Sequence, residues 1–371
     1  MAEPLKNMYS ESFLQGFTVH MKEVYPSFAA QDFLQQVLDQ QWPNLELKER
    51  MRHIANCLRQ HLPKDLATSF GLLQKLALQL RGGVEESMSF EYMFLPDFVQ
   101  QYGIDNYDLS VGAMEDITQY SSCEFAVRPF LVRYEDAMLT QMLQWAEHKN
   151  AMVRRLASEG SRPRLPWGLG VPNLKKNPSL TLAILEKLYQ DPSETVRRSV
   201  ANHLNDMAKD HPEVVLNTVE RWHGKSANTD WLIKHACRTL LKQSHPRALA
   251  LFGLGGAESI NIANFQVITP MVTLGEALTF QFDLEHTLNR SLLIRLEYAM
   301  YYRKANGNLS KKVFKISEKE YAPQASVRIE RKQSFKPITT RKYYAGLHQV
   351  AIIANGREFA AHDFTLQTQA T

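Results

Sequence analysis

The residues between 124 and 206 combine carboxylates, arginines and an indole in a pattern that suits chemistry on a cation or a sugar. The stretch RRLASEGSRPRLPWG, residues 154–168, places Glu159 at the end of a helical pattern, then a loop rich in Gly, Pro and Arg, then Trp167. Glu124 and Asp206 also stand near arginines. A carboxylate on a basic surface repels phosphate and therefore needs a reason, and an exposed indole face attracts cations. The ordinary alternatives are ion pairing or capping for each acid and core packing for the indole.

Basic side chains recur around these acids at a regular interval. The motif Val-Arg-Arg occurs at 153–155 and again at 196–198, an offset of 43 residues. Arginines at fixed intervals suit phosphate oxygens, which they bind as a fork. The alternative is a solvated face with pairs such as Arg155 to Glu159. We predict that these residues bind a polyanion: Arg154, Arg155, Arg162, Arg164, Lys175, Lys176, Arg197, Arg198, Lys234, Arg238 and Lys242.

A helical region must position these residues. Apolar residues recur at steps of three and four from residue 10 to about 251, and short breaks such as NPSL and DPSE separate about thirteen expected helices. The offset is typical of HEAT-type repeats, which stack into a curved solenoid. Residues 229–241 offer a third copy and residues 123–133 a degenerate earlier one. The sequence therefore predicts a HEAT-like-repeat α-solenoid over residues 1–252.

The last third of the chain has the period of strands. Segments such as ALTFQFDLEH and LHQVAIIANG alternate apolar and polar residues, and NGN and NGR are turn signals. Short, evenly spaced strands predict an immunoglobulin-like β-sandwich over residues 258–371. Residues 253–257 are the expected linker. The fold class is thus multidomain, α-solenoid followed by β-sandwich.

Composition and charge limit the partners. The chain has 371 residues, 44% of them hydrophobic and 22% charged, and lacks both a long apolar run and a signal-peptide pattern. Its three cysteines show no C-x-x-C spacing, which favours reduced core thiols in a cytoplasmic protein. Residues 1–147 hold 11 Lys and Arg against 20 Asp and Glu, whereas residues 148–257 hold 17 against 9. This asymmetry favours a polyanion partner for the rear of the chain, with unevenly solvated charge as the alternative.

Three stretches together carry a family resemblance: SSCEFAVRPF, RRLASEGSRPRLPWG and DPSETVRRSVANHLNDMAKDHP. They resemble the AlkC branch of the AlkC/AlkD alkylpurine DNA glycosylases, in the form with a C-terminal immunoglobulin-like domain. The resemblance covers residues 90–250 well. It implies that Glu124, Glu159, Trp167 and Asp206 are catalytic and that the basic residues bind DNA. For a second aromatic wall the sequence offers only Trp231 and Tyr120.

The resemblance also implies a chemistry. A monofunctional glycosylase would hydrolyse the N-glycosidic bond of cationic bases such as 3-methyladenine in duplex DNA, without base flipping, metal or cofactor. Such a base leaves without protonation, so the carboxylates stabilise an oxocarbenium ion or orient water. We expect a cytoplasmic monomer, nucleoid-associated in a bacterium, that binds no membrane. The alternative is a non-catalytic HEAT-repeat scaffold for nucleic acid or protein.

The β-sandwich offers its own basic stretches. Residues 301–312 and 331–344 mix Lys and Arg with Asn, Ser, Thr and Tyr in segments rich in turn residues. Loops at one end of a sandwich are the usual recognition edge. We therefore predict that this domain assists DNA binding, against the alternative of a solubilising or spacer domain.

Overall fold

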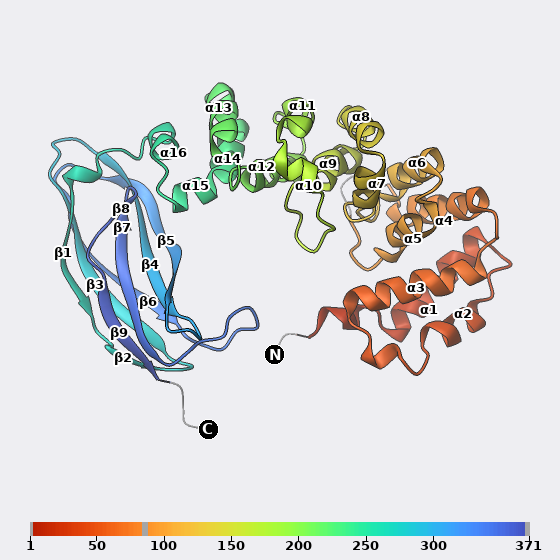
Figure 1. Ribbon diagram of the computed structural model, residues 1–371, viewed down its shortest axis with the longest axis horizontal. Coiled ribbons are helices and arrows are strands. Elements are labelled where there is room, and N and C mark those ends of the chain that lie inside the picture. The colour runs from red at the N-terminus through yellow and green to blue at the C-terminus, as the bar shows by residue number, and fades with distance from the viewer. Residues whose placement is uncertain (1–2, 84–87, 368–371) are drawn as a thin grey trace. The chain divides into compact units, whose positions relative to one another are not determined.

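A computed structural model describes residues 3–83 and 88–367 (Figure 1). The chain forms two compact units, of which the first ends at Ala236 and the second begins at Cys237. The first unit is helical. The second contains two short helices and all the strands. The predicted order, helical repeats followed by a β-rich immunoglobulin-like domain, is confirmed.

The described residues form sixteen α-helices rather than about thirteen, because three helices of five or six residues were too short for their period to be seen. The helices are α1 (Glu11–Val24), α2 (Ala30–Val37), α3 (Leu47–His61), α4 (Leu66–Arg81), α5 (Phe94–Gly103), α6 (Tyr107–Ile117), α7 (Val127–Arg133), α8 (Glu135–Trp145), α9 (Ala151–Gly160), α10 (Pro172–Lys176), α11 (Ser179–Leu188), α12 (Glu194–Met207), α13 (Pro212–Trp222), α14 (Ala227–Ala236), α15 (Arg238–Lys242) and α16 (Pro246–Leu251).

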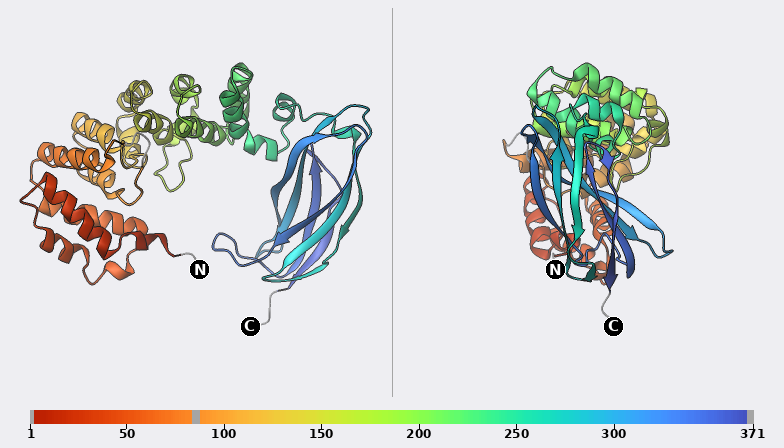
Figure 2. Two further views of the ribbon diagram at one scale, coloured as in Figure 1. Left: turned by 180° about the vertical axis from the view of Figure 1, so that it is seen from behind. Right: turned by 90° about the vertical axis from the view of Figure 1, so that its left-hand side faces the viewer.

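The two Val-Arg-Arg motifs begin equivalent helices. The side chain of Asn150 caps α9 and that of Ser193 caps α12, each accepting a hydrogen bond from a backbone N–H of the first turn. Val153 and Val196 are fully buried, so these motifs do turn their valines inward. Helices α9, α12 and α14 pack successively against one another, and Figures 1 and 2 show them as one row. Consecutive repeats therefore bring the ends of α9 and α12 together.

The strands of the second unit form two sheets. One has the order β1-β3-β6, and the other the order β2-β9-β7-β4-β5, with β8 paired to β7. Strand β3 alternates buried and half-buried residues along its whole length, as its sequence pattern predicts. The strands are β1 (Ile260–Val267), β2 (Met271–Thr273), β3 (Ala277–His286), β4 (Leu292–Arg303), β5 (Leu309–Tyr321), β6 (Ser326–Ser334), β7 (Gly346–Ala354), β8 (Arg357–Glu358) and β9 (His362–Gln367).

Helix α16 and the segment before it pack against the β7–β8 turn. That turn has positive φ at Asn355 and Gly356, as its NGR signal predicts. A Cβ added to Gly356 would lie 2.5 Å from Leu249 Cδ1 and 3.0 Å from Ser244 Cβ. Asn355 Nδ2 donates to the Gly255 carbonyl at 2.8 Å. Residues 253–257 thus mark the change from helix to strand, while the two compact units divide further upstream.

The three cysteines and the lengths of the helices can be compared with the predictions made from composition. Cys57, Cys123 and Cys237 are buried, and none of them forms a disulfide within the described residues, as expected of core thiols. Burial, with a smaller contribution from the Asp39 charge, raises the pKa of Cys57 to about 11, so its thiol is unreactive at neutral pH. Within the described residues, none of the helices has the length and apolar character that crossing a membrane requires.

The packing of α16 on the β7–β8 turn gives a stability prediction. Gly356→Ala and Gly307→Ala both place Ala at positive φ, but the nearest atom to a Cβ on Gly307 is Arg303 Nη2 at 3.7 Å. The overpacking at residue 356 should cost an additional 1–3 kcal/mol or so. We expect Gly356→Ala to lower the midpoint of thermal unfolding clearly more than Gly307→Ala. Equal losses would mean that α16 is not held by this turn.

Candidate active site

The three predicted carboxylates lie near the ends of successive helices and are joined through two arginines. Arg155 Nη2 lies 2.9 Å from Glu124 Oε2 and 4.0 Å from Glu159 Oε1. Arg162 Nη1 donates to Glu159 Oε1 at 2.5 Å, and Arg162 Nε and Nη2 both lie 2.8 Å from Asp206 Oδ2. The structure thus brings together all three acids in an alternating row of charges, which we call the carboxylate cluster: Glu124, Arg155, Glu159, Arg162 and Asp206.

Two other polar side chains donate hydrogen bonds to these carboxylates. Ser199 Oγ, on α12, donates to Glu159 Oε2 at 2.6 Å and so ties the acid of α9 to the next repeat. Lys209 Nζ donates to Asp206 Oδ1 at 3.1 Å. Neither Ser199 nor Lys209 was predicted, because residue spacing locates a helix face but does not reveal which side chain of the next repeat meets it.

Charge compensation by the arginines outweighs the effect of burial on Glu159. The exposed fractions of Glu159 and Asp206 are 5% and 2%. Burial would raise the pKa of Glu159, but the charges of Arg155 and Arg162 and the Ser199 hydrogen bond outweigh it and hold that pKa below its usual range. Burial likewise opposes the charge of Arg162, and Glu159 and Asp206 more than offset it, so its pKa is raised. Glu159 is therefore held as a preorganised anion at neutral pH.

Trp167 is exposed, with 62% of its surface open, so it is not a core indole. Its N-terminal neighbours Leu165 and Pro166 and the following Gly168 form a turn closed by a 3.1 Å hydrogen bond from the Gly168 N–H to the Leu165 carbonyl. Trp167 occupies the third position with a φ of 63°, which normally favours glycine. This conformation costs roughly 1–2 kcal/mol for an ordinary residue, and such strain is concentrated at functional sites.

A small apolar hollow lies beside this indole. Trp167, Phe90 and Phe125 line it together with methionines and Tyr9. Lys48 Nζ, from α3, donates to the Trp167 carbonyl and lies 5.0 Å from the centre of the Phe125 ring. Phe90 is 42% exposed and is therefore an aromatic side chain beside Trp167 that sequence reasoning missed. Phe90 lies just before a helical segment, and that position in the sequence does not indicate that it meets Trp167.

The two aromatic candidates from the sequence lie elsewhere. Trp231, on α14, stacks on His235 with ring centres 5.5 Å apart, and the Arg198 guanidinium lies 5.8 Å from the centre of its ring. Tyr120 packs edge-on against Tyr92 at 5.2 Å. Neither lines the hollow that contains Trp167.

Several predicted polyanion-binding arginines hold helix junctions. Arg154 binds both carboxylate oxygens of Asp191, at 2.6 and 2.9 Å. Arg197 is 8% exposed and donates to the carbonyls of Asp191 and Pro192 at 2.6 and 2.7 Å. Arg164 forms a forked pair with Asp210 at 3.0 and 2.7 Å. The predicted pair of Arg155 with Glu159 is also present.

The other predicted basic residues are more open. Lys175 and Lys176 are exposed on α10, and the side chain of Arg198 is 59% exposed beside Glu194. Lys234 is half-buried on α14. Arg238 is half-buried and Lys242 exposed on α15, which belongs to the second unit.

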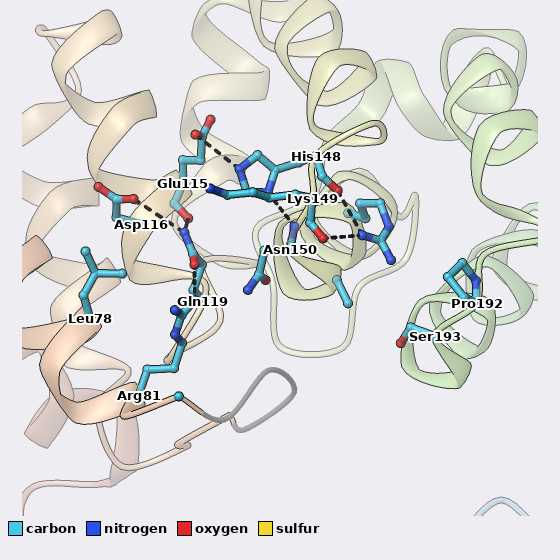
Figure 3. Close-up of a pocket in the computed structure, with 13 residues that line it drawn as sticks. Leu78, Arg81, Glu115, Asp116, Gln119, His148, Lys149, Asn150, Pro192 and Ser193 are labelled. Carbon is cyan, nitrogen blue, oxygen red and sulfur yellow. Dashed lines mark hydrogen bonds and ion pairs between the residues drawn. The ribbon is translucent and has the colours of Figure 1, made fainter.

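A polar hollow of about 880 Å³ lies at the opposite ends of α9 and α12 (Figure 3). Arg81, Lys149 and Arg154 line it together with the carboxylates of Glu115 and Asp116. No member of the carboxylate cluster lines this hollow. Its mixed charge differs from the apolar slot that would receive a flipped base.

Comparisons with known proteins found relatives of both parts of the chain. Residues 99–240 match the family described as DNA alkylation repair enzyme, and residues 261–368 match the YhaZ C-terminal Ig-like domain family. The chain is 43% identical to the uncharacterized protein YhaZ of Bacillus subtilis (strain 168) over 97% of its length and 98% of that protein. It is similar to the alkylpurine DNA glycosylase AlkC of Pseudomonas fluorescens bound to DNA with an abasic-site analog, at 37% identity and a TM-score of 0.92, covering 98% of this chain and 100% of that one.

A buried histidine joins the two helices that carry Glu159 and Asp206. His203 Nδ1 lies 2.9 Å from the Ser158 carbonyl, so this nitrogen carries the proton, and Nε2 accepts from the Thr181 hydroxyl at 3.1 Å. Burial outweighs the Ser158 hydrogen bond and lowers the pKa of His203 to about 4. His203 is therefore neutral in the folded protein at neutral pH.

This histidine should make stability depend on pH. The pKa in the folded protein, about 4, lies below the ordinary histidine value of 6.5, so the unfolded chain takes up the proton first as the pH falls. The free energy of unfolding should decline by about 3 kcal/mol between these values. We expect His203→Asn, which keeps a donor toward Ser158, to flatten that part of the curve in denaturant titrations. Parallel curves for the variant and the wild type would contradict this.

Proposed function

The chain belongs to the AlkC branch of the AlkC/AlkD alkylpurine DNA glycosylases, and from this premise we propose that it excises cationic alkylated bases such as 3-methyladenine from duplex DNA. The observation that carries the proposal is a pair of buried carboxylates, Glu159 and Asp206, that share the guanidinium of Arg162, on the loop that also carries the exposed Trp167. The enzyme acts as a monofunctional hydrolase, as a monomer and without base flipping.

The proposed reaction uses charge that is already present. The C1′–N bond breaks, its electron pair neutralises the positively charged base, and an oxocarbenium ion develops on the deoxyribose. Glu159 and Asp206 stabilise that cation electrostatically, and the face of Trp167 adds attraction for it. Glu124, at the other end of the cluster, supports Glu159 through Arg155. Water then adds to C1′, and a carboxylate or solvent takes its proton, which leaves an abasic sugar.

The proposed DNA path follows the exposed cations of the first unit. We assign phosphate contacts to Lys175, Lys176 and Arg198, which reach into solvent. Arg154 and Arg164 are paired with Asp191 and Asp210, and Arg197 donates to backbone carbonyls, so we assign these three arginines to the helix junctions that support the path. Arg155 and Arg162 act chiefly through the carboxylates that they bind. We also assign phosphate contacts to Lys234 of the first unit and to Arg238 and Lys242 of the second.

The role of Glu159 can be tested by removing its charge alone. Glu159→Gln keeps shape and should keep DNA affinity, while the single-turnover rate of 3-methyladenine release falls about 10²–10³-fold. The matched control is Glu147→Gln, because Glu147 is an exposed acid paired with Lys187. We expect the control to release base at the wild-type rate.

Two outcomes would contradict this account in different ways. Release at a near wild-type rate by Glu159→Gln, in a protein that remains folded, would remove Glu159 from catalysis. A wild-type protein that binds methylated duplex and releases no base would instead favour the non-catalytic scaffold.

The basic turn of the second unit gives a separate prediction. Residues 336–342 form an exposed turn with a bridge between Ile338 and Arg341, and both Lys336 and Lys342 are exposed. Changing both lysines to Gln should weaken binding to every duplex alike and flatten the salt dependence by about two phosphate contacts. Lys319→Gln, on the exposed side of β5, is the control and should leave the salt slope unchanged. An unchanged slope in the double variant would place this turn off the DNA.

A further inference from the structure

Arg128, on α7, is a buried cation that is not a member of the carboxylate cluster. It is 1% exposed. Its Nη1 donates to the carbonyls of Gly160 and Arg162, both at 2.9 Å, and its Nε donates to the carbonyl of Leu169. The hydrogen bonds described for this guanidinium thus all go to the backbone of one loop, residues 160–169.

The choice of partners is unusual for a buried arginine. A buried guanidinium normally faces a carboxylate that compensates its charge. Here burial and the neighbouring charge of Arg162 lower the pKa of Arg128 to about 10, so it stays charged at neutral pH at the expense of some stability. The charges of Asp206 and Glu124 act on Arg128 from a distance, but its hydrogen bonds go to loop carbonyls, so its directional contacts hold the loop.

The loop that Arg128 holds carries two parts of the active site. Arg162, whose carbonyl binds Arg128, directs its side chain to Glu159 and Asp206. Trp167 lies between the bound carbonyls of Arg162 and Leu169, in the left-handed conformation. Both ends of the strained segment are thus fixed by one side chain.

Gly168 shows how closely Arg128 packs against the loop of residues 160–169. A Cβ added there would lie 3.0 Å from Arg128 Cδ and 2.9 Å from Leu165 Cδ2. The stem of Arg128 therefore packs directly on the backbone that follows Trp167. A side chain at residue 168 would therefore press on the stem of Arg128 and on the side chain of Leu165.

We propose that Arg128 is a positioning residue of the active site, which sets the place of the Trp167 indole and of the Arg162 guanidinium through the backbone of residues 160–169. This rests on the proposed function, since it assigns how that site is preorganised. Catalytic groups displaced by about 1 Å lose on the order of 100-fold in rate. Binding of the flanking phosphates depends on other side chains and survives the displacement.

The sharpest test compares two glycines of the same loop. Gly168→Ala keeps every polar group but crowds both Leu165 and the stem of Arg128, whereas a Cβ on Gly170 meets nothing within 4 Å. We expect Gly168→Ala to lower the single-turnover rate of 3-methyladenine release on the order of 100-fold with DNA affinity near wild type. Gly170→Ala should retain both.

A second variant gives a measurement on the free protein. Arg128→Lys has one ammonium group and cannot reach three carbonyls on both sides of the loop. Acrylamide quenching of Trp167 fluorescence, isolated by subtracting the Trp167→Phe partner of each protein, should change in Arg128→Lys and Gly168→Ala and not in Gly170→Ala. If Arg128→Lys does not fold, the glycine pair still decides.

The outcomes separate this inference from the proposed function. An active wild-type protein, with Gly168→Ala equally active or losing rate and DNA affinity in the same proportion, overturns the positioning role of Arg128 and leaves the glycosylase intact. A wild-type protein that releases no base overturns the proposed function, and unchanged quenching in Gly168→Ala then overturns the positioning role as well. If the wild-type protein releases no base but quenching changes in Gly168→Ala, the result supports the contact between Arg128 and the loop.

Discussion

The guanidinium of Arg162, shared between the carboxylates of Glu159 and Asp206, is the interaction on which the rest of the site depends. Two buried anions on adjacent repeats would repel each other and take up protons, because desolvation penalises the charged form. One cation between them, with Arg155 and Lys209 at the outer sides, keeps Glu159 ionised. Removing one partner of such an arrangement costs about 3–5 kcal/mol. The site thus holds negative charge in a place from which water is largely excluded.

The repeat architecture is what supplies this arrangement. Because α9 and α12 are equivalent helices packed side by side, an acid near the end of each lands beside the other. Ser199 and His203 of α12 reach α9 at Glu159 and Ser158, so the two helices cannot slide without breaking hydrogen bonds to the site. Hydrogen bonds from Arg128 and Lys48 to the loop offset the strain of the turn at Trp167.

Sequence reasoning located the helical repeats, the sandwich, the three acids and the exposed indole, because each has a period or a local composition that one sequence displays. It misjudged what surrounds them. The sequence predicts Arg162 and Arg197 to be surface cations, but both are buried. A periodic pattern does not distinguish a residue that faces solvent from one that faces the neighbouring repeat. Arg128, Ser199 and Phe90 left no signal, because their partners lie about 30 residues or more away in sequence. The division of the chain after Ala236 left no mark in the sequence, since helical residues continue past it in α15 and α16.

The central claim is that a fixed anionic site removes a base that already carries its own positive charge. Its most direct test is the pH dependence of single-turnover release of 3-methyladenine from a defined duplex, with enzyme in excess. Since the lowered pKa of Glu159 keeps that group ionised and no general acid is required, the rate should be flat from about pH 6 to pH 9. A rate that falls steadily as the pH rises through this range would show that the leaving base must be protonated by the enzyme, and would contradict the account.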